Sequence, residues 1–103
     1  MQQGVPSNDG TNPFIMYYVY ILLLKNNQLY SGFTKDLKRR IAEHKIGKAK
    51  FTSTRLPIKL IHYESYLMES DARRREKYLK TTEGKRFLKR QLRDLIIQLN
   101  LNA

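Results

Sequence analysis

Residues 18–44 read YVYILLLKNNQLYSGFTKDLKRRIAEH, and this stretch decides the fold. Residues 16–24 are almost continuously apolar or aromatic, and Tyr, Val and Ile favour strands, so they predict a central strand covered on both faces. An Asn-Asn pair follows, and asparagine tolerates the left-handed backbone of tight hairpin turns. Residues 28–33 are then the returning strand, in which Gly32 suits a bulge or a close backbone approach. The stretch therefore begins as a β-hairpin.

A helix is predicted to follow the hairpin directly. Thr34 or Asp36 can cap its start, and Gly47 is a natural stop at its end. At about 100° per residue, one face of this helix is apolar except for a histidine. The residues on that face are Leu37, Ile41 and His44.

The two adjacent arginines of this helix are not equivalent. Arg40 flanks the apolar face by less than a right angle, whereas Arg39 points nearly the opposite way. We therefore expect Arg40 to lean toward the core and Arg39 to face water.

The rest of the chain predicts one more strand. Residues 48–55 form a basic loop with a single aromatic residue. Residues 58–66 follow with alternating side chains and with Pro57 at the start, a pattern typical of a strand. The sequence shows no internal repeat, so we predict a single domain over residues 16–100.

Two helices are predicted after that strand. The first begins at Ser70 or Asp71 and ends near Lys80; Gly84 then interrupts the pattern, and a third helix reaches about Leu99. The apolar stripe of the third helix is Leu88, Leu92, Leu95, Ile96 and Leu99.

A carboxylate lies within the apolar stripe of the second helix. That stripe is Met68, Ala72 and Leu79, and Glu76 falls in its middle. A lone carboxylate on a buried face is costly unless it is paired or binds a cation. An ion pair with a nearby arginine and a cation site are both open at this point.

The composition of the chain limits the chemical classes of partner that it can bind. The 103 residues carry 20 Lys and Arg against 9 Asp and Glu, a net charge of +11, which favours a polyanionic partner. An anionic membrane is disfavoured because there is no apolar run of membrane-spanning length. The absence of cysteine excludes disulfides, Cys-ligated zinc and thiol catalysis.

The N-terminal segment is read separately from the domain. Residues 1–15 are mostly polar and rich in Gly, Pro and Asn, so we predict a disordered leader or a tag remnant. They lack the pattern of a signal peptide, and a cytoplasmic location is the expectation.

The order of the polar residues resembles the GIY-YIG nuclease superfamily, most closely its small stand-alone bacterial members. The resemblance covers roughly residues 16–90. It rests on Tyr18-Val19-Tyr20, Tyr30-Ser31-Gly32, Arg40, His44 and Glu76. It departs from the pattern in two places, because Tyr18 replaces the first glycine and Ser31 the middle isoleucine.

This resemblance implies an α+β fold, a three-stranded antiparallel sheet flanked by helices, and cleavage of DNA phosphodiesters with one divalent metal. Tyr20 matches the tyrosine that closes the first motif, and Tyr30 the one that opens the second. Arg40 matches the arginine that holds the scissile phosphate, His44 the helix histidine, and Glu76 the metal ligand.

These residues predict a division of chemical roles. A single carboxylate plus water ligands suits Mg²⁺, with Mn²⁺ as a substitute. Tyr20 is the expected general base with Tyr30 in support, although the reverse assignment stays open. His44 is expected either to accept a proton from the tyrosine or to hydrogen-bond the phosphate.

The predicted function is a structure- or damage-directed DNA endonuclease with little sequence specificity, active in DNA repair. RNA stays open as a substrate, and a protein partner is a possible source of targeting. The alternatives are a catalytically inactive nucleic-acid-binding module of the same fold and a basic protein–protein adaptor. The cations predicted to contact nucleic acid are Lys48, Lys50, Arg55, Arg74, Lys77 and Lys80.

Overall fold

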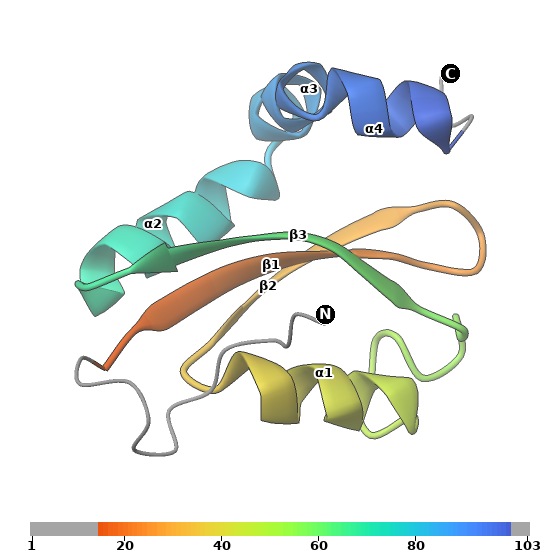
Figure 1. Ribbon diagram of the computed structural model, residues 1–103, viewed down its shortest axis with the longest axis horizontal. Coiled ribbons are helices and arrows are strands. Elements are labelled where there is room, and N and C mark those ends of the chain that lie inside the picture. Colours follow the sequence, from red (N-terminus) through yellow and green to blue (C-terminus); the bar gives the residue numbers. More distant parts are fainter. Residues whose placement is uncertain (1–14, 100–103) are drawn as a thin grey trace, which may run out of the picture.

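The computed structural model describes residues 15–99. It contains three strands and four helices, arranged as a sheet between helical layers (Figure 1). The predicted leader, apart from Ile15, lies outside the described residues. The elements in chain order are β1 (Tyr17–Leu23), β2 (Leu29–Thr34), α1 (Leu37–Lys45), β3 (Lys59–Tyr66), α2 (Glu69–Leu79), α3 (Thr82–Gln91) and α4 (Arg93–Gln98).

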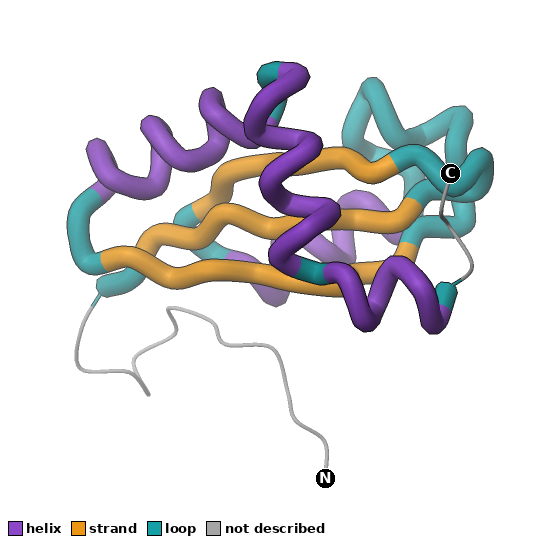
Figure 2. Tube along the Cα trace, turned by 90° about the horizontal axis from the view of Figure 1, so that it is seen from above, coloured by secondary structure: helices purple, strands orange, loops and turns teal. Residues whose placement is uncertain are grey.

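The sheet is antiparallel throughout, with the strand order β2-β1-β3, so the predicted fold class is confirmed. The first strand is the central one, as its apolar run predicts, and β2 and β3 form the two edges. α1 lies against one face of the sheet, whereas α2 and α3 cover the other (Figures 1 and 2).

Local signals set the boundaries of the hairpin and of α1. Asn27 has a φ of 66°, so one residue of the asparagine pair adopts the expected left-handed backbone. Asp36 caps α1 by accepting a hydrogen bond from the backbone N–H of Arg39 at 3.2 Å. Gly47, with a φ of 82°, follows the helix end as predicted.

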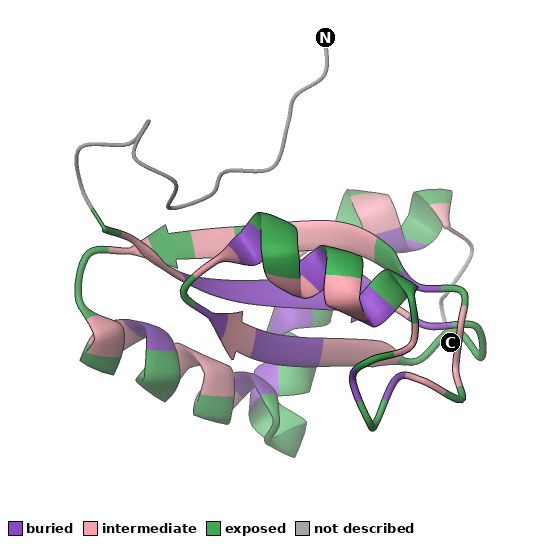
Figure 3. Cartoon of the chain, turned by 90° about the horizontal axis from the view of Figure 1, so that it is seen from below, coloured by how far each residue is buried: buried purple, intermediate pink, exposed green. Residues whose placement is uncertain are grey.

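Alternation along β1 divides the core into two clusters. On the α1 face, Tyr18, Tyr20 and Leu22 pack with Leu37 and Ile41. Figure 3 shows buried segments at regular intervals along α1, and the predicted burial of Leu37, Ile41 and His44 is confirmed.

The second cluster lies on the face that α2 and α3 cover. There Val19 and Ile21 pack with Ala72, Leu79 and Leu88. Because the central strand is buried on both faces, it holds both helical layers in register with the sheet.

The start of α2 differs from the prediction. The helix begins at Glu69 after Met68, whose backbone is extended and whose side chain forms no capping bond. Met68 precedes the first turn, so its side chain does not share the buried stripe and is 60% exposed. Its assignment to that stripe is therefore wrong.

The prediction that Gly84 interrupts the helical pattern is also wrong, because Gly84 lies within the first turn of α3. A Cβ atom at this position would lie 1.9 Å from the carbonyl oxygen of Tyr78. The glycine therefore allows the end of α2 to pack against the start of α3, and Thr81 caps the new helix.

The predicted third helix is divided in two at Leu92. Hydrogen bonds continue across the division, from Leu92 N to Leu88 O and from Ile96 N to Leu92 O. The apolar stripe therefore continues as well, with Leu88 and Ile96 both buried. No helix within residues 15–99 is long and apolar enough to cross a membrane.

Candidate active site

The site is built around the contact between Tyr20 and Gly32. These two residues are directly opposite each other in the pairing of β1 with β2. A Cβ atom on Gly32 would lie 2.3 Å from the Tyr20 hydroxyl oxygen. The missing side chain thus lets the Tyr20 ring lie across β2 toward the free edge of the sheet. The close approach predicted at Gly32 is made by a side chain, and the bulge lies elsewhere, between β1 and β3.

A buried chain of hydrogen bonds leads away from Tyr20. Its hydroxyl lies 2.8 Å from Nε2 of His44, and Nδ1 of His44 lies 2.7 Å from Oγ1 of Thr52. His44 and Thr52 are fully buried. When Nδ1 carries the hydrogen, it donates to Thr52 and Nε2 accepts from Tyr20; the other tautomer reverses both bonds. Both ring nitrogens are used, which leaves neither for a phosphate.

Thr52 was not predicted as part of the site. It lies in the loop between α1 and β3, where no periodicity marks a buried position. A threonine within a polar, basic loop gives no sequence signal that would distinguish it from a solvated residue.

Burial sets the protonation of this pair. It raises the pKa of Tyr20 to about 12, although a hydrogen bond from Arg40 opposes the rise. Burial also lowers the pKa of His44 to about 4, and the positive charge of Arg40 adds to that effect. Near neutral pH the tyrosine is therefore protonated and the histidine uncharged.

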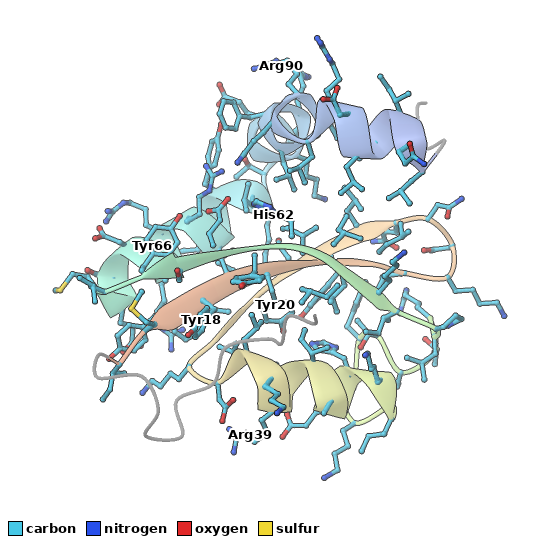
Figure 4. All side chains as sticks on the ribbon, viewed as in Figure 1. Tyr18, Tyr20, Arg39, His62, Tyr66 and Arg90 are labelled. Atoms are coloured by element: carbon cyan, nitrogen blue, oxygen red, sulfur yellow. The ribbon has the colours of Figure 1, made fainter. Side chains whose placement is uncertain are left out.

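The two arginines of α1 differ as predicted. The Arg40 side chain is 35% exposed and its Nη1 donates to Oε1 of Glu43 at 3.0 Å, whereas the Arg39 side chain is 72% exposed. Figure 4 shows Arg39 directed away from the sheet. The charge of Arg40 opposes the rise that burial causes in the pKa values of Tyr20 and Tyr30.

Tyr30 lies beside Tyr20 on the same face of the sheet, and it is more exposed. Its ring packs edge-on to His44, with centroids 5.7 Å apart, and stacks on Phe51 at 5.4 Å. Burial raises the pKa of Tyr30, Arg40 lowers it and Glu76 raises it. Tyr30 therefore feels both the cation of α1 and the carboxylate of α2.

Glu76 reaches the site from the other helical layer. Its negative charge raises the pKa values of both Tyr20 and Tyr30. α2 covers the opposite face of the sheet, and its end is joined to the edge strand β2 by the bond from Lys80 to the Ser31 carbonyl. Five predicted residues from four elements thus share one region: Tyr20, Tyr30, Arg40, His44 and Glu76.

Lys80, one of the predicted nucleic-acid contacts, also contacts the groups of the site, and its role toward nucleic acid stays a prediction. Its Nζ donates to the backbone carbonyl of Ser31 at 2.6 Å and lies 3.5 Å from Oε2 of Glu76. The same nitrogen lies 4.8 Å from the centroid of the Tyr30 ring. Its ammonium is therefore directed toward the site and not only toward solvent.

The donor set fits a hard cation that keeps most of its water. Within residues 15–99 there is no group of three or more His, Asp or Glu side chains that would form a protein cage. Glu76 supplies one carboxylate with its side chain 21% exposed, and Ser31 supplies a carbonyl oxygen. Both oxygens already contact a positive group, the Lys80 ammonium, so the position favours a cation.

The other predicted nucleic-acid contacts fall into two groups. Lys48 and Lys50 are exposed on the loop after α1, and Arg55 lies 4.0 Å over the ring of Phe51, which joins this loop to Tyr30. Arg74 and Lys77 are exposed on α2, where Arg74 pairs with Asp71. The loop cations are thus linked to the site, and all these roles stay predictions.

Comparison with known proteins identifies the family of this chain and several relatives. Residues 16–91 match the family model described as the GIY-YIG catalytic domain. A UPF0213 protein of Staphylococcus haemolyticus is 45% identical over 74 residues, which are 71% of this chain and 90% of that protein. A UPF0213 protein of Haloquadratum walsbyi is 41% identical over 66 residues, covering 63% of this chain and 74% of that protein.

A solved structure is also similar. The solution NMR structure of a UPF0213 protein from Bacillus halodurans has 37% sequence identity and a TM-score of 0.47. The match covers 71% of this chain and 81% of that one.

Proposed function

The chain belongs to the GIY-YIG family of catalytic domains, and from this premise we propose that it is a Mg²⁺-dependent endonuclease that hydrolyses DNA phosphodiester bonds. We expect it to recognise the structure of the DNA or damage in it, with little sequence specificity. Mn²⁺ is expected to substitute for Mg²⁺.

One observation carries the proposal. The Lys80 ammonium lies 3.5 Å from Glu76 and 4.8 Å from the centroid of the Tyr30 ring, which joins the carboxylate of α2 to the tyrosines. Arg40 on α1 and Glu76 on α2, from opposite faces of the sheet, both shift the pKa values of Tyr20 and Tyr30, in opposite directions. A permanent cation, a carboxylate and two hydroxyls are the groups that phosphodiester hydrolysis uses for phosphate binding, cation binding and proton transfer. A net charge of +11 suits a polyanionic substrate.

In the proposed mechanism, Arg40 binds the scissile phosphate. Its guanidinium donates to the non-bridging oxygens and stabilises the charge that develops on them. Arg40 also lies close enough to Tyr20 to oppose the rise in the pKa of that tyrosine, so one cation acts on both the phosphate and the expected base. Glu76 and the carbonyl of Ser31 would hold the Mg²⁺ ion. When bound, the ion supplies Lewis-acid polarisation of the phosphate and stabilises the leaving oxygen.

Tyr20 acts as the base through a proton relay. With a pKa of about 12 it is protonated at neutral pH, so it can accept a proton only while passing its own to another group. Nε2 of His44, 2.8 Å away, is that group in the tautomer whose Nδ1–H donates to Thr52. The water proton then moves to Tyr20 as the Tyr20 proton moves to His44. Tyr30, which is more exposed, supports the water and the phosphate.

A plasmid-nicking assay tests this function. Supercoiled DNA with Mg²⁺ should be nicked by the natural protein and left intact by Glu76→Ala. Glu83→Ala is the matched control, because Glu83 is an exposed carboxylate in the first turn of α3, and this variant should nick normally. A parallel assay on RNA decides the class of nucleic acid.

A second candidate is a nucleic-acid-binding module that does not cleave. The observation in its favour is the ion pair between Lys80 and Glu76, which occupies the carboxylate that would bind the metal. Tight, salt-dependent DNA binding without nicking at any Mg²⁺ or Mn²⁺ concentration would establish this alternative and reject the endonuclease.

A further inference from the structure

One nitrogen atom, Nζ of Lys80, contacts three parts of the site. It donates to the Ser31 carbonyl at 2.6 Å, pairs with Glu76 at 3.5 Å and lies over the Tyr30 ring at 4.8 Å. An ion pair between Glu and Lys four residues apart is common on any helix and contributes little by itself. The bond to Ser31 is different, because it joins the end of α2 to an edge strand 49 residues earlier in the chain.

These contacts are those that a bound cation would make. The carboxylate of Glu76 and the carbonyl of Ser31 are hard oxygen donors, and an aromatic face attracts positive charge. Both oxygens lie within 3.5 Å of the same nitrogen, so they converge on one point. A divalent ion bound to Glu76 at that point would meet strong Coulomb repulsion from the ammonium a few ångströms away. The two cations therefore compete for one position.

We infer that the Lys80 ammonium is the resident cation of this site and that a divalent ion binds Glu76 only by displacing it. The inference rests on the proposed function, because it concerns the cation that the endonuclease would use. Lys80 is a positioning residue in this sense: it holds Glu76 and β2 together while no metal is bound. Metal binding then releases the ammonium toward the open edge of β2, where a phosphate would lie.

Mn²⁺ binding to the full chain tests the inference without a cleavage assay. Electron paramagnetic resonance of free Mn²⁺, or calorimetry, gives the dissociation constant directly. Lys80→Met removes the competing charge and should tighten Mn²⁺ binding by about tenfold. Lys80→Arg keeps a cation on the same side chain, and its affinity should stay within about threefold of the natural protein.

The matched control is Lys77→Met. Lys77 is exposed and lies next to Glu76 on the same helix. The substitution removes the same charge as Lys80→Met but leaves the contacts with Ser31 and Tyr30 in place. It should change the Mn²⁺ affinity by less than about twofold, as expected for a solvent-screened charge. Equal effects of Lys77→Met and Lys80→Met would reduce the result to net charge and overturn the inference. So would unchanged or weaker binding in Lys80→Met.

A second measurement uses the natural protein and does not depend on the stability of a variant. In NMR spectra, the side-chain signals of Lys80 should shift as Mg²⁺ is added, and the shift should saturate with the dissociation constant from calorimetry. If Mg²⁺ binds and the Lys80 signals stay in place, no displacement occurs. Nicking is measured separately. If Lys80→Met binds Mn²⁺ more tightly but the natural protein does not nick DNA, the proposed function is rejected and the inference is kept. If the natural protein nicks DNA but Lys80→Met does not bind Mn²⁺ more tightly, the function is kept and the inference is rejected.

Discussion

Two polar clusters lie on opposite faces of the same sheet, and they differ in how completely their charges are paired. On the α2 face, the carboxylate of Glu64 accepts bonds from His62, Tyr66 and Arg75 at 3.1, 2.7 and 3.0 Å. Figure 4 shows His62 and Tyr66 on this side and Tyr20 toward α1. On the α1 face, Tyr20, His44 and Thr52 form a buried chain with no carboxylate of its own.

The difference separates a structural cluster from a chemical one. The bonds from His62, Arg75 and Tyr66 outweigh the cost of burial and lower the pKa of Glu64 to about 2, so its charge is already satisfied. Around Tyr20 burial dominates, and its pKa rises to about 12 while that of His44 falls to about 4. Tyr20 and His44 are held uncharged beside Arg40, so this region can still bind a charged ligand, whereas the carboxylate of Glu64 is already paired within the protein.

The largest expected effect concerns the cluster of Tyr20, His44 and Thr52 beside Arg40. Arg40→Ala should lower the rate of plasmid nicking by about 10²–10³-fold, the usual loss when one donor to a developing oxyanion is removed. Arg39→Ala is the matched control: it removes the same side chain one residue earlier, from a position that is 72% exposed. A rate within about twofold of the natural protein is expected for Arg39→Ala. Equal losses in the two variants would show that α1 contributes only charge.

The next effect is the pH dependence of stability that His44 causes. Its pKa is about 4 in the folded protein and about 6.5 in an unfolded chain. Between these values the unfolded chain binds more protons, so folded stability is full above pH 6.5 and falls as the pH drops toward 4. The loss should be about 3 kcal/mol, since one pKa unit corresponds to about 1.4 kcal/mol.

Urea denaturation at pH 7 and at pH 4 measures this loss, and His44→Gln should remove most of it. His62→Gln is the control, because it deletes the other histidine, which belongs to the paired cluster. Glu64 contributes in a lower window: its pKa is depressed, so its contribution is present above about pH 4.5 and is lost as the pH falls toward 2. If His62→Gln removed the loss between pH 6.5 and 4 instead, the contrast between the clusters would fail.

The smallest of the three effects concerns the paired cluster around Glu64. Arg75→Met removes the charged partner of Glu64 and should lower the free energy of unfolding by about 2 kcal/mol, because His62 and Tyr66 still bond the carboxylate. Thermal or urea denaturation measures it. The nicking rate of the folded variant should be unchanged, since Arg75 contacts none of the groups around Tyr20. A large loss of nicking with normal stability would show that both clusters are functional.

Much of the fold follows from local sequence patterns. The apolar run predicts the central strand, the asparagine pair the hairpin, and Asp36 and Gly47 the ends of α1. Helical periodicity alone separates Arg40 from Arg39, because neighbours on a helix point about 100° apart. These features depend on backbone geometry over a few residues, which is why a single sequence is enough to predict them.

The long-range contacts of the site, and the packing of the end of α2 against α3, could not be predicted in this way. Thr52 bonds His44 from an irregular loop, Lys80 bonds Ser31 across 49 positions, and Gly84 meets the end of the previous helix. Each depends on the distance between elements that are far apart in sequence or joined by a turn without periodicity. The pattern of side chains along the sequence does not predict the distances between these elements.

The sequence by itself determined the order of the elements, the buried face of each main helix and the types of residue available for chemistry. Only the tertiary structure decided which oxygen each cation contacts, and so placed Arg40 beside Tyr20 and Lys80 against Glu76. The physical reason is one of range. Backbone periodicity is set by neighbouring residues, whereas a contact from a long side chain of one element to another element depends on how each helix packs on the sheet.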